Sequence, residues 1–406
     1  MLKVDTIIRN ISKLYTVDEK FTVIEDAATA FKAGKIAWIG KDSDYKKNVS
    51  AKKVVNAKGM IATPGFIDCH THLVFAGTRE DEYVKRIKGK SYMEIAKEGG
   101  GIMASVRKNR EASFDELYES GFERLNRILS FGVTTCEIKS GYGLELQTEG
   151  KILKVIKRLS KDHAVDLVPT FLGAHEIPTE YKSNRQKYIE IIKKEMIPKF
   201  AEEKLAEFCD IFCEEGVYSI DESRDILETA KEYGYKIKLH ADEFVDTNGA
   251  ALAAELGAVS ADHLMAANED GLKNMAEKGV IGVVLPGTSF NLGSTKFAPA
   301  RKMIELGMKV AIATDFNPGS SMSEFLPLMG TIACNYMKLT PEEVLKGITI
   351  NAAYAVGREK EIGNLKVGKK ADLVLMNILS INYFPYHYGI NHVKEVWKSG
   401  KRLLYR

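Results

Sequence analysis

Five of the eight histidines in this chain lie at the ends of short apolar runs: His70, His72, His175, His240 and His263. A neutral imidazole binds a metal such as Zn²⁺ at about 2.0 to 2.1 Å, and metal sites form where several such side chains converge. The positions of these histidines therefore indicate a metal centre, if the fold brings the ends of the runs together.

His70 and His72 are spaced to act as a pair. Residues two apart on a strand point to the same face, whereas on a helix they would diverge. His240 ends the separate run KIKLH and Asp315 follows KVAIAT, so they add a third nitrogen and a carboxylate oxygen. Together these four residues predict one metal site. Considered alone, Asp315 could equally cap the next helix, and His240 could be a hydrogen-bonded core residue.

The segments that carry these residues alternate with longer amphipathic segments, which is the pattern of repeated βα units. Eight runs favour strands: 65–72, 133–141, 166–176, 209–216, 235–243, 258–264, 279–287 and 309–319. Residues 149–163 and 248–257 favour helices. Eight strands fit a TIM-like (β/α)₈ barrel, in which the carboxyl ends of all strands meet at one mouth. A doubly wound sheet is the competing architecture, but no GxGxxG follows the first strand and no GxxxxGK[ST] occurs.

Both ends of the chain differ from the middle, because they contain short β-type runs separated by polar or glycine turns. We expect residues 1–60 and 358–406 to combine into one composite β domain. Residues 61–357 would then form the catalytic barrel.

Composition excludes several classes of partner. Lys and Arg number 58 against 55 Asp and Glu, and this balance does not favour nucleic acid. No run approaches the roughly 18 apolar residues of a membrane helix. The N-terminus lacks the pattern of a secretory signal. The 5 cysteines have no paired spacing, which is typical of reduced thiols, so we expect a cytoplasmic protein.

Several motifs resemble the amidohydrolase superfamily: PGFIDCHTH, HADE, SADH, TDFNPGS and, in the tail, ADLVLMN. The resemblance covers nearly the whole chain. It is closer for the ordered set HTHLVFAGTRE, EGGGI, KSGYGLE, FLGAHEIP and TDFNPGSS. That set implies a branch that hydrolyses the cyclic amide of a small molecule, 4-imidazolone-5-propanoate, to N-formimidoyl-L-glutamate in histidine degradation. The family fold is a barrel plus a small β-sandwich built from both termini, and a homodimer is expected.

The resemblance also bears on the metal. Relatives with two metals use a bridging lysine carboxylate or glutamate on a central strand, and PTFLGAHE offers no lysine. Lys139 lies one strand earlier, where we expect it to form an ion pair. One divalent metal is therefore expected, and the ligand set suits Zn²⁺ and Fe²⁺ alike.

Three residues are candidates for proton transfer. Asp315 could both bind the metal and accept a proton from the attacking water. His263, at the next strand end, would stabilise the developing oxyanion or shuttle a proton. Glu243 lies three residues after His240, where it could contact the ring nitrogens or protonate the leaving amine; the alternative is a solvated loop residue.

The substrate carries a propionate, and Arg79 in the first βα loop could clamp it with its planar guanidinium. The resemblance adds further substrate contacts: Tyr92, Tyr142, His175, Asn317, Gly319 and Ser320. Gly99, Gly100 and Gly101 predict a flexible loop over the site. Asp68 either orients a metal ligand or is a buried structural carboxylate.

Two other functions stay open at this stage. A purine or pyrimidine deaminase would use the same metal set on an amidine-like ring carbon. A non-catalytic scaffold of the superfamily would bind partners, although such a protein would be expected to lose metal ligands.

Overall fold

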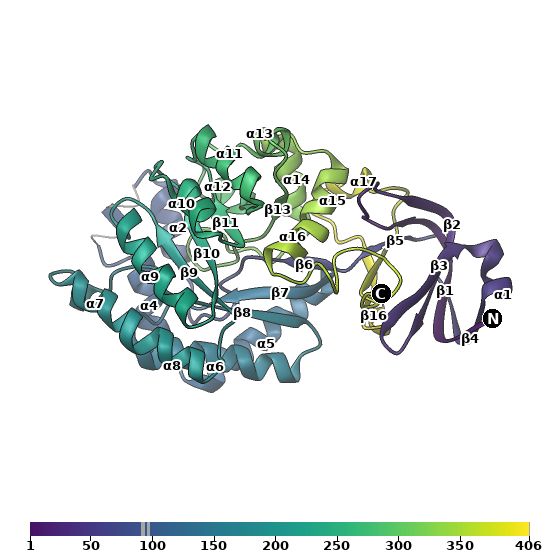
Figure 1. The fold of residues 1–406 in the computed structure, drawn as a ribbon, viewed down its shortest axis with the longest axis horizontal. Helices are drawn as coiled ribbons and strands as arrows, with labels where there is room; N and C mark the ends of the chain where they lie inside the picture. The colour runs from purple at the N-terminus through teal and green to yellow at the C-terminus, as the bar shows by residue number, and fades with distance from the viewer. Residues whose placement is uncertain (91–93, 96–97, 406) are drawn as a thin grey trace.

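The computed structural model describes residues 1–90, 94–95 and 98–405, which form a helix-covered barrel and a separate sheet (Figure 1). The sheet lies at one end of the molecule and contains both termini. Within the described residues, no helix combines the length and the apolar character needed to cross a membrane.

Eight parallel strands make the barrel, and they follow one another in chain order. They are β6 (Phe66–Asp68), β7 (Val133–Lys139), β8 (Asp166–Ala174), β9 (Phe208–Cys213), β10 (Lys236–Ala241), β11 (Ser260–His263), β12 (Ile281–Val284) and β13 (Val310–Ile312). Each overlaps one of the eight runs predicted to be strands. The expected TIM-like barrel is confirmed.

The barrel closes where the segment after its first strand, β6, pairs with the segment after its last strand, β13. The backbone N–H of Asp315 donates to the carbonyl of His70 at 3.0 Å, and that of His72 donates to the carbonyl of Phe316 at 2.9 Å. Thr71 and Phe316 form a parallel bridge between these two bonds. Strand β6 is shorter than the predicted run, so His70 and His72 lie beyond its end, in this seam.

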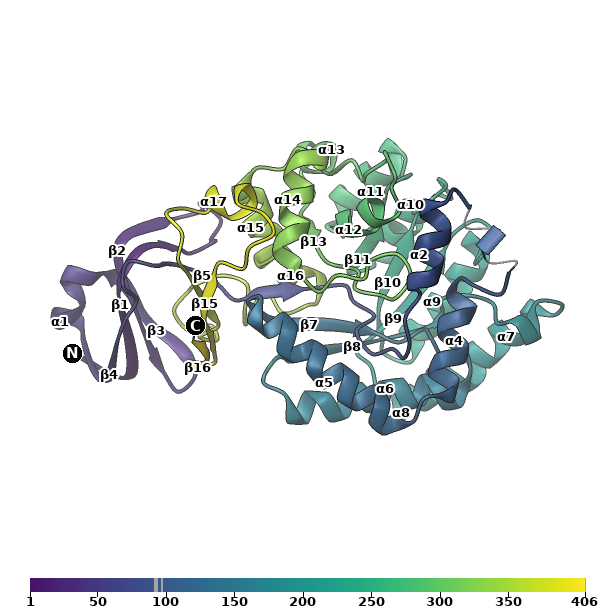
Figure 2. The same cartoon turned by 180° about the vertical axis from the view of Figure 1, so that it is seen from behind.

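Helices surround the strands on the outside of the barrel, as Figures 1 and 2 show. They are α2 (Glu80–Ile87), α4 (Ile102–Glu111), α5 (Phe114–Ser130), α6 (Leu146–Asp162), α7 (Arg185–Ile191), a π-helical turn (Ile192–Met196), α8 (Ile197–Glu202), α9 (Ile220–Glu232), α10 (Gly249–Leu256), α11 (Glu269–Lys278), α12 (Pro286–Asn291), α13 (Ala300–Glu305), α14 (Leu326–Met337), α15 (Pro341–Gly347) and α16 (Ile350–Ala355). The predicted helices at 149–163 and 248–257 correspond to α6 and α10.

The terminal sheet has eight strands: β1 (Leu2–Tyr15), β2 (Val23–Lys32), β3 (Lys35–Lys41), β4 (Val49–Asn56), β5 (Ile61–Pro64), β14 (Leu373–Met376), β15 (Val393–Lys398) and β16 (Lys401–Tyr405). Strands from the two ends meet where β5 pairs antiparallel with β14. The expected β unit built from both termini is confirmed. Short helical pieces accompany it at Asp42–Asp44, α1 (Tyr45–Asn48) and α17 (Tyr383–Tyr386), and one more 3₁₀ turn, Thr179–Tyr181, lies on the barrel side.

An ion pair from a buried lysine attaches this sheet to the barrel. Lys398 Nζ on β15 lies 2.7 Å from Asp166 on β8 and 2.6 Å from Asp372 beside β14. The Lys398 and Asp372 side chains are almost completely buried, so each needs the other's charge. The sheet therefore packs against the amino ends of the barrel strands, opposite the mouth that holds the histidines.

Candidate metal centre and active site

Three histidines converge at the barrel mouth. One ligand atom from each of His70, His72 and His240 lies within 4.8 Å of the others, and all three side chains are buried. Among the described residues, His70 Nε2 and His240 Nε2 are buried without a hydrogen-bond partner. A buried polar atom without a partner is costly, and a shared cation would satisfy both atoms. The predicted histidine set is therefore brought together in a form that fits a metal.

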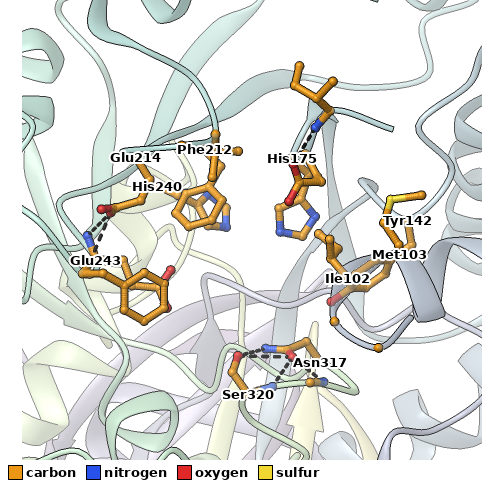
Figure 3. Close-up of a pocket in the computed structure, with 18 of the residues that line it drawn as sticks. Ile102, Met103, Tyr142, His175, Phe212, Glu214, His240, Glu243, Asn317 and Ser320 are labelled. Atoms are coloured by element: carbon orange, nitrogen blue, oxygen red, sulfur yellow. Dashed lines mark hydrogen bonds between the residues drawn. The ribbon is translucent and has the colours of Figure 1, made fainter. Parts of the chain in front are cut away.

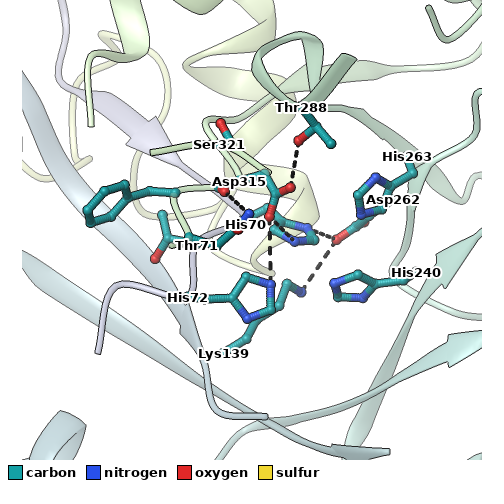
Figure 4. Close-up of polar contacts among 12 residues, drawn as sticks. His70, Thr71, His72, Lys139, His240, Asp262, His263, Thr288, Asp315 and Ser321 are labelled. Carbon is teal, nitrogen blue, oxygen red and sulfur yellow. Dashed lines mark hydrogen bonds and ion pairs between the residues drawn. The ribbon is translucent and has the colours of Figure 1, made fainter. Parts of the chain in front are cut away.

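Asp315 lies beside this group. Its Oδ1 is 3.4 Å from His70 Nε2 and 3.7 Å from His72 Nε2. Its Oδ2 accepts a hydrogen bond from the Thr288 hydroxyl at 2.6 Å, so one oxygen faces the histidines and the other is held by α12 (Figure 4). Within the described residues, the set of mutually close ligand atoms contains the three histidines and not Asp315.

Carboxylates behind two of the histidines fix their orientation. His70 Nδ1 is hydrogen-bonded to Asp262 Oδ2 at 2.6 Å, whereas His240 Nδ1 lies 3.1 Å from Asp210 Oδ2, close enough for an ion pair but outside hydrogen-bond geometry among the described residues. A carboxylate at Nδ1 favours the tautomer whose Nε2 carries a lone pair, which is the form that binds metal. The His70 ring therefore presents Nε2 to the mouth, and the Asp210 carboxylate near His240 Nδ1 favours the same tautomer in the second ring.

Burial sets the protonation states at the site. It lowers the pKa of His70 and of His72 well below the usual value, so both rings stay neutral. It raises the pKa of Asp315 to about 6. Neutral imidazoles beside a carboxylate that is still ionised at neutral pH are the states that a divalent cation requires of its ligands.

His263 and Glu243 face each other across the mouth. His263 is the last residue of β11, and its Nδ1 lies 3.7 Å from Glu243 Oε2. Burial raises the pKa of Glu243 well above its usual value, aided by the nearby Asp315 charge. Glu214 holds this loop, since its carboxylate accepts the backbone N–H groups of Glu243, Phe244 and Val245.

A cavity of about 1240 Å³ opens at the mouth. The predicted substrate residues that line it are Arg79, Tyr142, His175, Glu243, Asn317, Gly319 and Ser320. In Figure 3, His175 and Tyr142 lie on one side, Glu243 on the opposite side, and Asn317 with Ser320 below. Tyr92, the remaining substrate candidate, lies outside the described residues.

Arg79 is held by a neighbouring carboxylate. Its Nε and Nη2 both donate to Glu82 Oε2, at 3.0 and 2.7 Å. Glu82 Oε1 accepts the backbone N–H of Gly101, so the predicted glycine loop is tied to this pair. A β-carbon on Gly319 would lie 2.2 Å from Arg79 Nη1, which explains the glycine there. The third guanidinium nitrogen, Nη1, therefore packs against Gly319, which also lines the cavity.

Lys139 and Asp68 take structural places beneath the site. Lys139 is completely buried and forms ion pairs with Glu137 and Asp210, as expected, so it is not free to act as a bridging ligand. Asp68 accepts hydrogen bonds from the backbone and hydroxyl of Thr314, the residue before Asp315. Burial raises the pKa of Asp68 to about 7.

Sequence analysis missed the groups that support the ligands: Asp210, Asp262 and Thr288. A signal was present for two of them. Asp210 interrupts the apolar run FCDIFC, and Asp262 precedes His263 on a buried strand. A charged residue inside a buried strand is rarely tolerated unless it is paired, so both positions implied a buried partner.

Comparison with known proteins agrees with this fold. Residues 61–403 match the model of the amidohydrolase family. The chain belongs to the amidohydrolase family. Among curated proteins it is similar to imidazolonepropionase from Alkaliphilus oremlandii (strain OhILAs), with 49% identity over 98% of both chains, and to imidazolonepropionase from Clostridium tetani (strain Massachusetts / E88), with 50% identity over 98% of both. The resemblance found in the sequence motifs is confirmed.

Solved structures resemble the chain in fold. An adenosine deaminase from Xanthomonas campestris with bound zinc has a TM-score of 0.74 and 19% identity, covering 99% of this chain and 93% of that one. A 5-methylcytosine deaminase from Klebsiella pneumoniae has a TM-score of 0.77 and 16% identity, covering 98% and 97%. At these identities the likeness supports the architecture and not a shared activity.

The burial of His175 predicts a pH dependence of stability. Burial lowers its pKa from 6.5 to about 3, so between these values the unfolded chain binds one more proton at this residue than the folded chain. Its contribution to stability is complete above the unfolded pKa and is lost as the pH falls. The slope of the unfolding free energy against pH is proportional to the difference in bound protons between the unfolded and folded chains. Between pH 6 and 4, the substitution His175→Gln should reduce this difference by up to about one proton and lower the slope accordingly. Urea unfolding of metal-depleted protein measures this slope.

The metal-depleted unmodified chain, unfolded under the same conditions, is the reference for this slope. An unchanged slope in the His175 variant would contradict the assignment of a buried neutral imidazole.

Proposed function

We propose that the chain is an imidazolonepropionase that hydrolyses 4-imidazolone-5-propanoate to N-formimidoyl-L-glutamate. The observation that carries the proposal is near-full-length similarity to curated imidazolonepropionases, at 49 and 50% identity over 98% of the chain. The cavity supports it, because one wall carries the histidine group and another carries a fixed cation, Arg79. A cyclic amide with a carboxylate tail needs both.

The proposed metal is a single Zn²⁺ or Fe²⁺, with His70, His72, His240 and Asp315 as ligands. The three histidines fit by their mutual distances, and Asp315 fits by its approach to two of them. Such a metal, when bound, would lower the pKa of a water ligand and polarise the amide carbonyl. The Thr288 hydroxyl keeps Asp315 Oδ1 turned toward the histidines.

The remaining residues would guide protons. Hydrolysis adds one water molecule: its oxygen joins the new carboxylate, and a proton reaches the ring nitrogen as the C–N bond breaks. Asp315 is the proposed acceptor of the proton from water. His263 Nδ1, which is buried without a hydrogen-bond partner among the described residues, would donate to the carbonyl oxygen as charge develops there. Glu243, whose pKa burial raises, would hold a proton near the leaving nitrogen.

Substrate orientation is assigned to Arg79, Tyr142 and His175, which all line the cavity. The Arg79 Nη1 group is available for the propionate, because Nε and Nη2 already bond to Glu82. Asn317, Gly319 and Ser320 form a tight turn in which Asn317 Oδ1 accepts the backbone N–H groups of the other two. This turn would shape the cavity floor around the ring.

The proposal also includes an assembly, a location, partners and domain bounds; the homodimer rests on the family resemblance, and the rest on the composition and sequence patterns. The chain would act as a homodimer in the cytoplasm, without a nucleic-acid or membrane partner. It would comprise a catalytic barrel of residues 61–357 and a composite domain of residues 1–60 and 358–406.

Turnover of freshly prepared 4-imidazolone-5-propanoate tests the activity directly. Metal-quantified protein should remove the ultraviolet absorbance of the substrate and release N-formimidoyl-L-glutamate. Guanine and cytosine serve as comparison substrates and should remain unchanged. Deamination of either base without turnover of the imidazolone would overturn the proposal in favour of a deaminase, and protein that binds no metal would favour a scaffold.

Substitution of Arg79 tests the proposed carboxylate contact. Loss of one charge-assisted contact should raise KM by about 10- to 100-fold with a smaller change in kcat. The double variant Arg79→Met/Glu82→Gln gives the cleaner comparison, since it leaves no unpaired buried carboxylate. Lys182→Met, at another cation that lines the cavity, is the control and should change KM less than about threefold. An unchanged KM in the Arg79 variants would exclude this residue as the clamp.

A further inference from the structure

Five charged side chains lie in the centre of the barrel, directly beneath the histidine group. They are Glu137, Lys139, Asp210, Lys238 and Asp262, and each is 0% exposed. Glu137 and Lys139 are two residues apart on β7, so both point inward. Isolated charges in such a place would cost several kcal/mol each. Side chains of opposite charge must therefore lie in close contact with one another.

Lys139 is the hub of this cluster. Its Nζ lies 2.7 Å from Asp210, 3.0 Å from Glu137 and 3.4 Å from Asp262. In Figure 4, dashed lines join the Asp262 carboxylate to both His70 and Lys139. Burial disfavours the ammonium, but the three carboxylates outweigh it and raise the pKa of Lys139, so the charge persists.

Two of the carboxylates that Lys139 holds are those that contact the metal-facing histidines. Asp262 contacts His70 Nδ1, and Asp210 contacts His240 Nδ1. One ammonium thus joins two carboxylate–histidine pairs that come from four different strands or strand ends. Without this cation, Asp210 and Asp262 would be buried anions close to each other, and they would repel or move apart.

We propose that Lys139 is a positioning residue: it locks Asp210 and Asp262 against His240 and His70 and so sets the affinity of the site for its metal. This inference rests on the proposed function only in that a metal occupies the site. Loss of groups that support metal ligands typically weakens binding by about 10- to 100-fold. Lys139 therefore acts through the ligands and does not touch the substrate.

Lys238 provides a matched comparison. It is buried as completely as Lys139 and belongs to the same cluster, but among the described residues it forms an ion pair with Glu137 alone, at 2.7 Å. Replacement of either lysine by methionine removes one buried positive charge and keeps a side chain of similar length. Only the Lys139 change removes an ammonium in direct contact with both carboxylates that face histidines; Asp262 keeps its hydrogen bond from the Ser260 hydroxyl in either variant.

The test measures metal affinity by competition with a chromogenic chelator, for the full chain loaded with Zn²⁺. Lys139→Met should weaken Zn²⁺ binding by about 10- to 100-fold, and Lys238→Met by less than about threefold. The visible absorption spectrum of the Co²⁺-loaded protein should change in the first variant and not in the second. Equal losses in both variants, or an unchanged affinity for Lys139→Met, would overturn the proposal.

A second variant keeps the test decisive if Lys139→Met does not fold. Lys139→Met/Glu137→Gln removes one charge of each sign, so the net buried charge equals that of the unmodified chain; Lys238 loses the carboxylate of its ion pair, and Asp210 and Asp262 still lose the cation that they share. It should show the same loss of Zn²⁺ affinity, and wild-type affinity in this folded variant would overturn the proposal. Failure of the unmodified chain to bind Zn²⁺ or Fe²⁺ would instead count against the proposed function.

Discussion

The arrangement of the site depends on the seam that joins the first and last segments of the barrel. Two backbone hydrogen bonds, from Asp315 to His70 and from His72 to Phe316, fix the end of the chain's last barrel strand against the end of its first. Three of the four proposed metal ligands lie in this seam. A sheet left open here would separate Asp315 from the histidines by the full width of the barrel, so closure of the barrel is also assembly of the site.

A second constraint comes from the charges buried in the barrel. Neutral imidazoles need acceptors at Nδ1 to present Nε2 to a metal, and carboxylates buried as acceptors need a cation of their own. Lys139 is the cation that contacts both of these carboxylates, Asp210 and Asp262. The mouth can carry unpartnered nitrogen atoms toward the cavity because each carboxylate of the cluster beneath it is paired with a buried lysine. Above this layer, the glutamates Glu82 and Glu214 hold Arg79 and the Glu243 loop in place.

Much of this could be predicted from the sequence. The alternation of apolar runs and amphipathic segments located all eight barrel strands, and the two-residue spacing of His70 and His72 correctly placed both side chains at one site. Strand ends also located His175 and His263, because the carboxyl ends of parallel strands share one mouth. The motifs identified the family that the comparisons confirm.

The supporting contacts could not be predicted. His70 and Asp262 are 192 residues apart in sequence, and no local pattern pairs them. The hydrogen bond from Thr288 to Asp315 and the two hydrogen bonds from Arg79 to Glu82 depend on side-chain directions that only the folded backbone defines. Asp315 adopts a positive φ of 51°, and no feature of the neighbouring sequence predicts this conformation. How each proposed ligand is held in place therefore has to be taken from the structure.

The central claim is that one divalent metal, held by the histidines and Asp315 at the seam, makes this site catalytic. Titration of metal-depleted protein with Zn²⁺ or Fe²⁺, with turnover of 4-imidazolone-5-propanoate followed at each addition, tests it most directly. We expect activity to rise linearly and to level off at one metal per chain. A plateau at two metals per chain, or full activity before any metal is added, would contradict it.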